Sequence, residues 1–203
     1  MPNSKVLLFG DSILNCSQLP KNSRLITLIK KKFISKKRKI LFKIIGLNGY
    51  TSKKAFFYLK KKKIKDYFDV AIIQFGVNDS WHFKSLNGKA NVKQKDFRKY
   101  MIKILKILKK RVNKIYISTY HKLAKKRLEV NNKTVNQNLE KYNKIIRTLK
   151  NKKKNIYCLD FERKTFSRRN KICLPKPDEV HLSKIGSEVY SKIIYKEILK
   201  NNL

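Results

Sequence analysis

The sequence places a serine where it could act as a nucleophile, in the segment Gly10-Asp11-Ser12-Ile13 directly after an apolar run. A serine hydroxyl becomes nucleophilic when a neighbouring base removes its proton. Gly10 permits a sharp turn at the end of the run, which would expose the hydroxyl. Taken alone the segment is weak evidence, because a serine in this place usually belongs to a turn or caps a helix.

Two later segments contain groups that can bind a negatively charged oxygen. Residues 46–52 (GLNGYTS) carry two glycines ahead of a predicted helix, so the backbone amide of Gly49 could be exposed. Residues 76–79 (GVND) follow another apolar run and offer the side-chain amide of Asn78. Amides of this kind stabilise the oxyanion that forms during acyl transfer. Each segment is also compatible with an ordinary loop.

A serine nucleophile needs a base, and the chain has three histidines, His82, His121 and His181. His181 ends the segment 178–181 (DEVH), in which an aspartate three residues earlier can hold the imidazole in the tautomer that accepts a serine proton. Ser183 is a candidate cap for the last predicted helix and would fix this turn. An Asp-x-x-His spacing by itself more often marks a solvent-exposed pair.

The elements that must position these groups alternate along the chain. Apolar runs typical of buried strands occupy residues 5–9, 40–45, 69–75, 114–119 and 155–161. Segments of helical periodicity occupy residues 25–34, 52–63, 96–110, 134–150 and 183–199, with Ser52 as a candidate N-cap. Nearly continuous apolar strands separated by helices predict a parallel sheet covered on both faces.

We therefore predict an α/β protein with a single domain over residues 1–203. Its architecture is a three-layer α/β/α sandwich around a flavodoxin-like five-stranded parallel sheet of strand order 2-1-3-4-5. Ligands bind such sheets at the carboxyl ends of the strands, near the point where the strand order reverses. The loops after the first three strands would then be neighbours, so that Ser12, Gly49 and Asn78 surround one point. Together with a histidine base, this arrangement predicts an acyl-transfer site.

The segments GDSI, GLNGYTS, GVND and DEVHLS, in this order, resemble the sequence blocks of the SGNH/GDSL hydrolase family (GDSL-like lipases/acylhydrolases). The resemblance extends from Gly10 to His181, and the GxSxG elbow of α/β-hydrolases is absent. It implies a flavodoxin-like fold and a serine esterase that needs no metal and no cofactor. It also implies that Ser12 is the nucleophile, His181 the base and Asp178 the residue that orients the base.

The same resemblance assigns an oxyanion hole to the backbone amides of Ser12 and Gly49 and to the side chain of Asn78. Asp11 and Asp79, inside the matching blocks, would brace the loops. Members of the family act on acetylated sugars, lysophospholipids, acyl thioesters and simple esters. We expect hydrolysis or transfer of an acyl ester on a small molecule, glycan or lipid, with an acylated carbohydrate preferred. Lysophospholipase or thioesterase activity is the alternative.

Three residues outside these blocks are candidate substrate contacts. Trp81 and His82 follow the Asn78 segment directly, and His121 follows the fourth predicted strand, again at a carboxyl end. A structural histidine is the alternative for His82. Residues 80–92 lack periodicity and suggest an insertion over the site, where loops commonly set specificity.

The charge of the chain is extreme, with 52 Lys+Arg against 13 Asp+Glu and a formal net charge of +39. Because Lys, Asn and Ile are all abundant, a bias toward AT-rich codons would explain the charge without a function. The other interpretation is non-specific binding of a polyanion through a Lys-rich surface. The preponderance of Lys over Arg argues against specific base readout in nucleic acid. A basic nucleic-acid- or membrane-binding protein on an inactive hydrolase fold remains the competing hypothesis.

The remaining features point to a cytoplasmic enzyme. Three widely spaced cysteines form neither a disulfide pattern nor a zinc motif. The first residues lack the pattern of a signal peptide, and no apolar run is long enough to span a membrane. The sequence predicts no oligomeric state.

Overall fold

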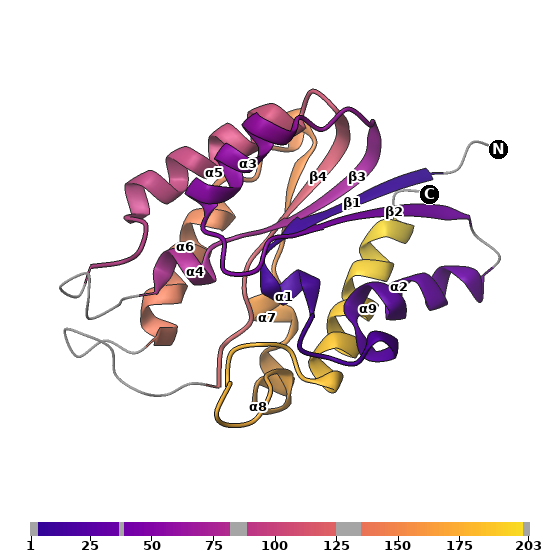
Figure 1. Cartoon of the computed structure of the whole chain (residues 1–203), viewed down its shortest axis with the longest axis vertical. Coiled ribbons are helices and arrows are strands. Elements are labelled where there is room, and N and C mark those ends of the chain that lie inside the picture. Colours follow the sequence, from indigo (N-terminus) through magenta and orange to yellow (C-terminus); the bar gives the residue numbers. More distant parts are fainter. Residues whose placement is uncertain (1–3, 37–38, 82–88, 125–134, 201–203) are drawn as a thin grey trace.

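A computed structural model describes residues 4–36, 39–81, 89–124 and 135–200 of the chain. Its strands are β1 (Ser4–Gly10), β2 (Ile40–Gly46), β3 (Phe68–Gln74), β4 (Val112–Ser118) and β5 (Ile156–Leu159). They form one parallel sheet of order β2-β1-β3-β4-β5, which confirms the predicted topology (Figure 1).

Helices cover both faces of the sheet. One layer contains α2 (Leu25–Ile34) and α9 (Lys184–Leu199), which pack on each other. The other layer contains α3 (Ser52–Lys62), α5 (Gln94–Leu108) and α6 (Val135–Thr148), and Figure 1 shows α3 and α5 on the opposite side of the sheet from α2 and α9. The architecture is thus the predicted three-layer α/β/α sandwich.

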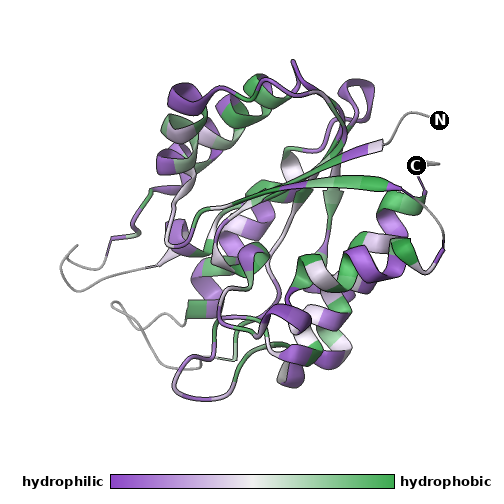
Figure 2. Cartoon of the chain, turned by 45° about the vertical axis from the view of Figure 1, so that its right-hand side comes forward, coloured by the Kyte–Doolittle hydropathy of each residue, from purple (hydrophilic) through white to green (hydrophobic). Residues whose placement is uncertain are grey.

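The first strand shows why the apolar runs form buried strands. Val6 and Leu8 join the apolar cluster that contains α2 and α9, whereas Leu7 and Phe9 join the cluster that contains α3 and α5. Since successive side chains of a strand point to opposite faces, a strand covered on both sides must be apolar throughout. Figure 2 shows the apolar colour running along the strands between helices whose outer sides are polar.

Short turns that periodicity could not predict occur at the strand ends. They are α1 (Ser12–Asn15), α4 (Val77–Ser80), α7 (Phe161–Lys164), α8 (Arg169–Ile172) and the 3-10 turns at Lys21–Ser23, Lys152–Lys154 and Phe166–Arg168. β5 also ends earlier than predicted, because the side chain of Asp160 caps α7 by accepting the amide of Arg163.

The predicted cap of α3 is wrong by one residue. Thr51 is the N-cap, and its hydroxyl accepts the amide of Lys54 at 3.3 Å. Ser52 is instead fully buried, and its amide and hydroxyl both donate to Asp79. Ser52, which the sequence pattern assigned to the helix cap, therefore binds the buried Asp79 instead. Ser183 does cap α9 as predicted, by accepting the amide of Gly186 at 3.0 Å.

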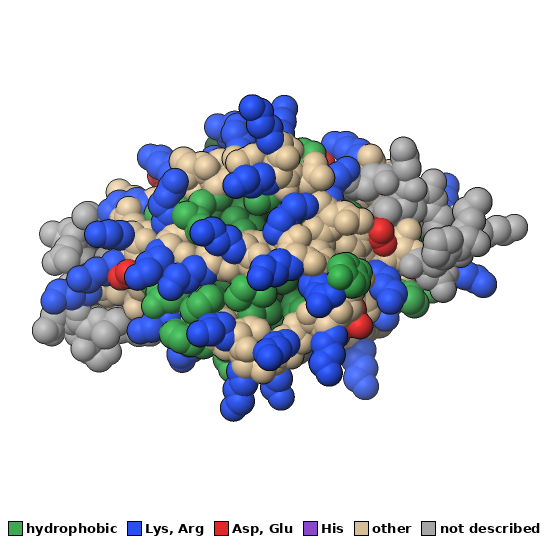
Figure 3. Space-filling model, turned by 90° about the horizontal axis from the view of Figure 1, so that it is seen from above, with side chains coloured by type: hydrophobic (Ala, Val, Ile, Leu, Met, Phe, Trp, Pro, Cys, Tyr) green, Lys and Arg blue, Asp and Glu red, His purple; other side chains and the backbone are tan. Residues whose placement is uncertain are grey.

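The lysines are distributed over the helices and over the loops that connect them to the strands. Figure 3, which views the layer of α3 and α5, shows many Lys and Arg side chains with apolar groups between them and few carboxylates. Polyanion binding by such a surface stays a prediction. Among the described residues, no helix has the length and apolar character needed to cross a membrane.

Candidate active site

The carboxyl ends of the three central strands bring the predicted site segments together. Gly10 at the end of β1 is in register with Gly46 of β2 on one side and with Gln74 of β3 on the other. The amide of Leu47 donates to the carbonyl of Gly10 at 2.7 Å, and the amide of Asp11 donates to the carbonyl of Gln74 at 3.3 Å. The three loops therefore leave the sheet side by side.

Ser12, His181 and Asp178 form a chain of hydrogen bonds. The Oγ of Ser12 lies 2.9 Å from Nε2 of His181, and Nδ1 of the same imidazole lies 2.7 Å from Oδ2 of Asp178. A neutral imidazole that donates from Nδ1 to the carboxylate has its Nε2 lone pair directed at the serine hydroxyl. A hydroxyl, an imidazole and a carboxylate are therefore aligned in one chain of hydrogen bonds.

Asp178 is held as an ionised acceptor. Its Oδ1 accepts the backbone amides of Val180 at 2.9 Å and His181 at 2.7 Å. Partial burial acts to raise the pKa of Asp178, but hydrogen bonds from His181 and Val180 outweigh it and hold this pKa below its ordinary value. The carboxylate is therefore charged at neutral pH and fixes both the backbone and the ring of His181.

The groups predicted to form an oxyanion hole lie on the neighbouring loops. Gly49 is exposed and adopts a φ of 71°, a conformation that favours glycine. The side-chain amide of Asn78 donates to the carbonyl of Tyr50 at 3.1 Å and to Oδ2 of Asp11 at 3.4 Å. Asn78 is thus held between the loop that carries Gly49 and the turn that carries Ser12.

Two fully buried carboxyl groups brace these loops. Oδ1 of Asp11 accepts the amide of Ile13 at 3.0 Å, and Asp79 accepts the amide of Ser52 at 3.0 and 2.9 Å. Burial raises the pKa of Asp11 and of Asp79 to about 7, against the hydrogen bonds that lower it.

The raised pKa of Asp79 predicts a pH-dependent stability. Because Asp79 binds its proton near pH 7 in the folded chain and near pH 3.9 in the unfolded chain, its contribution to stability falls as the pH rises between these values. We expect the unfolding free energy of the wild type to fall relative to that of Asp79→Asn between pH 5 and pH 8. Urea denaturation at both pH values measures this difference.

The comparison with the variant is necessary because two other buried groups contribute. His121 adds a trend of opposite sign, since burial lowers its pKa to about 4, and this trend is common to both proteins and cancels in the difference. Asp11 adds a trend of the same sign as Asp79, and because the Asp79 charge helps to raise the pKa of Asp11, the variant weakens that trend and enlarges the expected difference. Glu140→Gln, at an exposed carboxylate, is the control. A difference that stays constant or grows with pH would contradict the prediction.

The three candidate substrate contacts have different positions. His82 lies outside the described residues. Trp81 is half-buried and packs against the apolar cluster of α2 and α9. His121 is fully buried, and its two ring nitrogens lie 2.6 Å from the hydroxyl of Tyr190 and 3.3 Å from the carbonyl of Val180. His121 therefore lies inside the protein, against the backbone of the segment that carries His181, and not at the surface.

A basic cavity lies beside the Asn78 turn. It measures about 320 Å³, and its lining includes Lys53, Lys89, Lys93 and Tyr100. Asn91 in its wall donates to the carbonyl of Asn78 at 3.0 Å. No group of three or more His, Cys, Asp or Glu that could hold a metal ion occurs within the described part of the chain.

Sequence reasoning missed several residues that hold the site. They are Ser52 beneath Asp79, Asn91 against Asn78, and Tyr120, whose hydroxyl donates to Asp11. Each belongs to a segment remote in sequence from its partner, so no local spacing signals the contact. The position of Tyr120 at the carboxyl end of β4 was the one available indication.

The chain matches the model of the GDSL-like Lipase/Acylhydrolase family over residues 8–189. No curated protein matches it in a comparison of sequences. Solved structures with a similar fold include an acetyl xylan esterase, AlAXEase, with a TM-score of 0.74, 21% identity and coverage of 96% of this chain and 99% of that one.

Two further structures show the same fold. The acetylxylan esterase Axe2 from Geobacillus stearothermophilus has a TM-score of 0.74 and 18% identity, with coverage of 97% and 95%. The lipase/acylhydrolase from Enterococcus faecalis has a TM-score of 0.72 and 20% identity, with coverage of 96% and 95%. With the family model matched over most of its length, this chain belongs to the GDSL-like lipase/acylhydrolase family and is a carboxylic ester hydrolase.

Proposed function

We propose that Ser12, His181 and Asp178 form the catalytic triad of this ester hydrolase. The observation that carries the proposal is the hydrogen-bond chain of 2.9 Å from Ser12 to His181 and 2.7 Å from His181 to Asp178. It joins a nucleophile, a base and an orienting acid in the order that acyl transfer requires.

In the proposed reaction, Ser12 Oγ attacks the ester carbonyl carbon while Nε2 of His181 takes the hydroxyl proton. The carbonyl oxygen becomes an oxyanion, and its collapse breaks the bond to the alcohol, which leaves with the proton from His181. Water then gives a proton to His181 and attacks the acyl-serine. The second collapse releases the carboxylic acid and returns the proton to Ser12.

The oxyanion in both steps would accept hydrogen bonds from the backbone amides of Ser12 and Gly49 and from the side-chain amide of Asn78. The position of Asn78 between the two neighbouring loops supports this role. To donate to the oxyanion, its side-chain amide would give up the longer of its two contacts, that with Asp11 at 3.4 Å.

Asn78→Ala is expected to lower kcat by about 10²–10³-fold, since it removes one donor to the transition state. Steady-state hydrolysis of p-nitrophenyl acetate measures the change. Asn113→Ala, at an exposed position on β4, should retain full activity. Unchanged turnover in Asn78→Ala would remove this residue from the oxyanion hole.

For the substrate we propose an acyl ester of a carbohydrate. Two structures of similar fold bear the names of acetyl xylan esterases, and the side chains of His181 and Asp178 are partly exposed, as a site open to a polar alcohol group requires. Transfer of the acyl group to a sugar would use the same residues as hydrolysis.

A substrate panel tests this proposal. Acetylated xylo-oligosaccharides, a lysophospholipid and an acyl thioester are compared by kcat/KM, with Ser12→Ala as the blank. We expect the acetylated sugar to be preferred by at least about tenfold. A preference for the lysophospholipid or the thioester would transfer the assignment to that class.

A further inference from the structure

Two adjacent residues after β4 contact the residues that directly precede Ser12 and His181 in the chain. The hydroxyl of Tyr120 donates to Oδ2 of Asp11, the residue before Ser12. The ring of His121 faces the carbonyl of Val180, the residue before His181, at 3.3 Å. Both side chains are fully buried, and the bond between Tyr120 and Asp11 is buried as well, whereas the contact of His121 with Val180 is partly buried. The proposed mechanism uses neither side chain.

On the nucleophile side, the contact acts on the turn that presents the serine. Asp11 caps α1 by accepting the amide of Ile13, and Ser12 is the first residue of that helix. Since Tyr120 donates to the other carboxyl oxygen of Asp11, the position of the cap depends on the position of β4.

On the base side, the hydrogen-bond network assigns a single tautomer to His121. The hydroxyl of Tyr190 lies 2.6 Å from Nδ1 and also accepts the backbone amide of His121 at 3.4 Å. The hydroxyl proton therefore goes to Nδ1, and the Nε2 proton goes to the carbonyl of Val180. The reverse tautomer would direct a lone pair at that carbonyl. Burial lowers the pKa of His121 to about 4, so the ring is neutral at neutral pH.

A second bond from the same segment holds the base. The amide of Ala124 donates to the carbonyl of Glu179 at 3.1 Å. Two successive carbonyls ahead of His181 thus accept hydrogen bonds from residues that follow β4.

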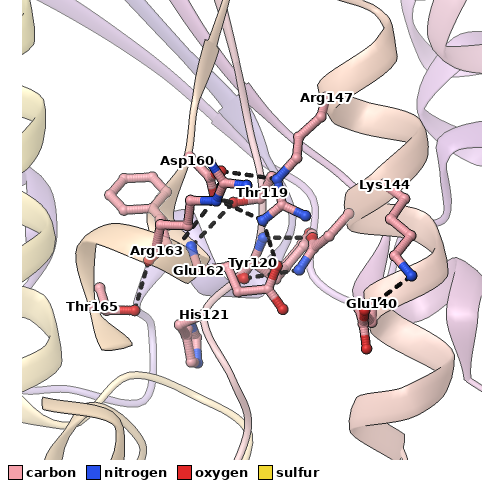
Figure 4. A network of polar contacts seen from close by, with 12 residues as sticks. Thr119, Tyr120, His121, Glu140, Lys144, Arg147, Asp160, Glu162, Arg163 and Thr165 are labelled. Carbon is pink, nitrogen blue, oxygen red and sulfur yellow. Dashed lines mark hydrogen bonds and ion pairs between the residues drawn. The ribbon is translucent and has the colours of Figure 1, made fainter. Parts of the chain in front are cut away.

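The segment that carries these contacts is itself anchored. The backbone amide and carbonyl of Tyr120 both bond to the side chain of Asn143 on α6, at 2.9 and 3.1 Å. The hydroxyl of Thr119 donates to Asp160, whose carboxylate binds both Nε and a terminal nitrogen of Arg147 at 2.8 and 2.9 Å (Figure 4). Residues 119–121 therefore have little freedom to move relative to the sheet.

From this arrangement we infer that Tyr120 and His121 are positioning residues that together set the separation between Ser12 Oγ and His181 Nε2. The inference rests on the proposed triad. One contact fixes the nucleophile turn and the other fixes the base segment, and the two residues are joined by a single peptide bond. A displacement of about 1 Å between reacting groups can cost about 10²-fold in rate.

The test compares two amides at position 121. Glutamine can place an N–H near the position of Nε2 and keep the bond to Val180, whereas asparagine reaches only as far as Nδ1 and keeps the contact with Tyr190. We expect His121→Asn to lower kcat for p-nitrophenyl acetate by about 10–100-fold with little change in KM. His121→Gln should retain most of the activity. Unfolding free energies of both variants are measured in urea.

Tyr120→Phe provides the matching change on the nucleophile side, because it removes only the hydroxyl that holds Asp11. It should lower kcat by a similar factor. In the double variant Tyr120→Phe/His121→Asn, the fold loss in kcat should be smaller than the product of the two single losses. The reason is that the loss of either hydrogen bond alone already frees the distance between Ser12 Oγ and His181 Nε2, which both residues set.

The outcomes separate this inference from the proposed function. Wild-type kcat in His121→Asn, or equal losses in both amide variants that follow their loss of stability, would overturn the positioning role while the triad stands. If the proposed triad is wrong, hydrolysis will survive in Ser12→Ala, whatever the activities of the variants at position 121.

Discussion

Replacing Ser12 with alanine is expected to lower kcat at least about 10⁴-fold for every carboxylic ester that the wild type hydrolyses. The hydroxyl is the only side-chain oxygen within hydrogen-bonding distance of Nε2 of His181 among the described residues. Without it no acyl-enzyme can form, and residual turnover would depend on water and the oxyanion donors alone. Turnover of p-nitrophenyl acetate is measured beside covalent labelling by a fluorophosphonate, which reports the nucleophile directly.

Ser17→Ala is the matched control for this experiment. Ser17 follows α1, and its hydroxyl accepts the side-chain amide of Asn48 at 3.1 Å, outside the hydrogen-bond chain of Ser12, His181 and Asp178. Labelling and turnover should persist in this variant and disappear in Ser12→Ala. Activity in folded Ser12→Ala within tenfold of the wild type would exclude Ser12 as the nucleophile.

The second large effect is expected for Asp178→Asn, with a fall in kcat of about 10⁴-fold. The amide oxygen can still accept the two backbone amides that now bond to Oδ1, so the turn should persist. Its NH₂ group would then face Nδ1 of His181 and donate to it. The imidazole would carry its proton on Nε2, where it cannot accept the proton of Ser12.

Because the substitution preserves shape and backbone contacts, the loss should appear in kcat with an unfolding free energy near that of the wild type. Glu179→Gln changes the adjacent acid to its amide and should leave kcat within a few-fold of the wild type. If both variants behave alike, Asp178 would not orient the base.

The fold was accessible from the sequence because each element has a periodic pattern that tertiary contacts reinforce. α2 begins and ends at the predicted residues, and the helix predicted over residues 96–110 is present as α5, with its apolar side chains from Phe97 to Leu108 buried. The strand order was assigned from the flavodoxin-like topology that five strands in a chain of this length suit, because right-handed crossovers alone would allow other orders.

The site was accessible only in part. Ser12, Asp178 and His181 lie in segments whose local spacing suggests chemistry, and the structure brings them within hydrogen-bonding distance. Tyr120 and Asp11 are 109 residues apart in the sequence, and no local spacing along the chain predicts such a contact. His121 was predicted to face substrate because β4 ends there, but the direction of its side chain depends on Tyr190 of α9.

The hydrogen bond between Ser12 and His181 joins residues that are 169 positions apart. A contact of such range forms only after the intervening chain has closed a very large loop, which costs entropy that local contacts do not repay. A partly folded chain in which β1, β2 and β3 have paired would therefore present the nucleophile without its base. Recovery of esterase activity during refolding should then lag behind recovery of secondary structure. Esterase activity would therefore report when folding of the chain is complete.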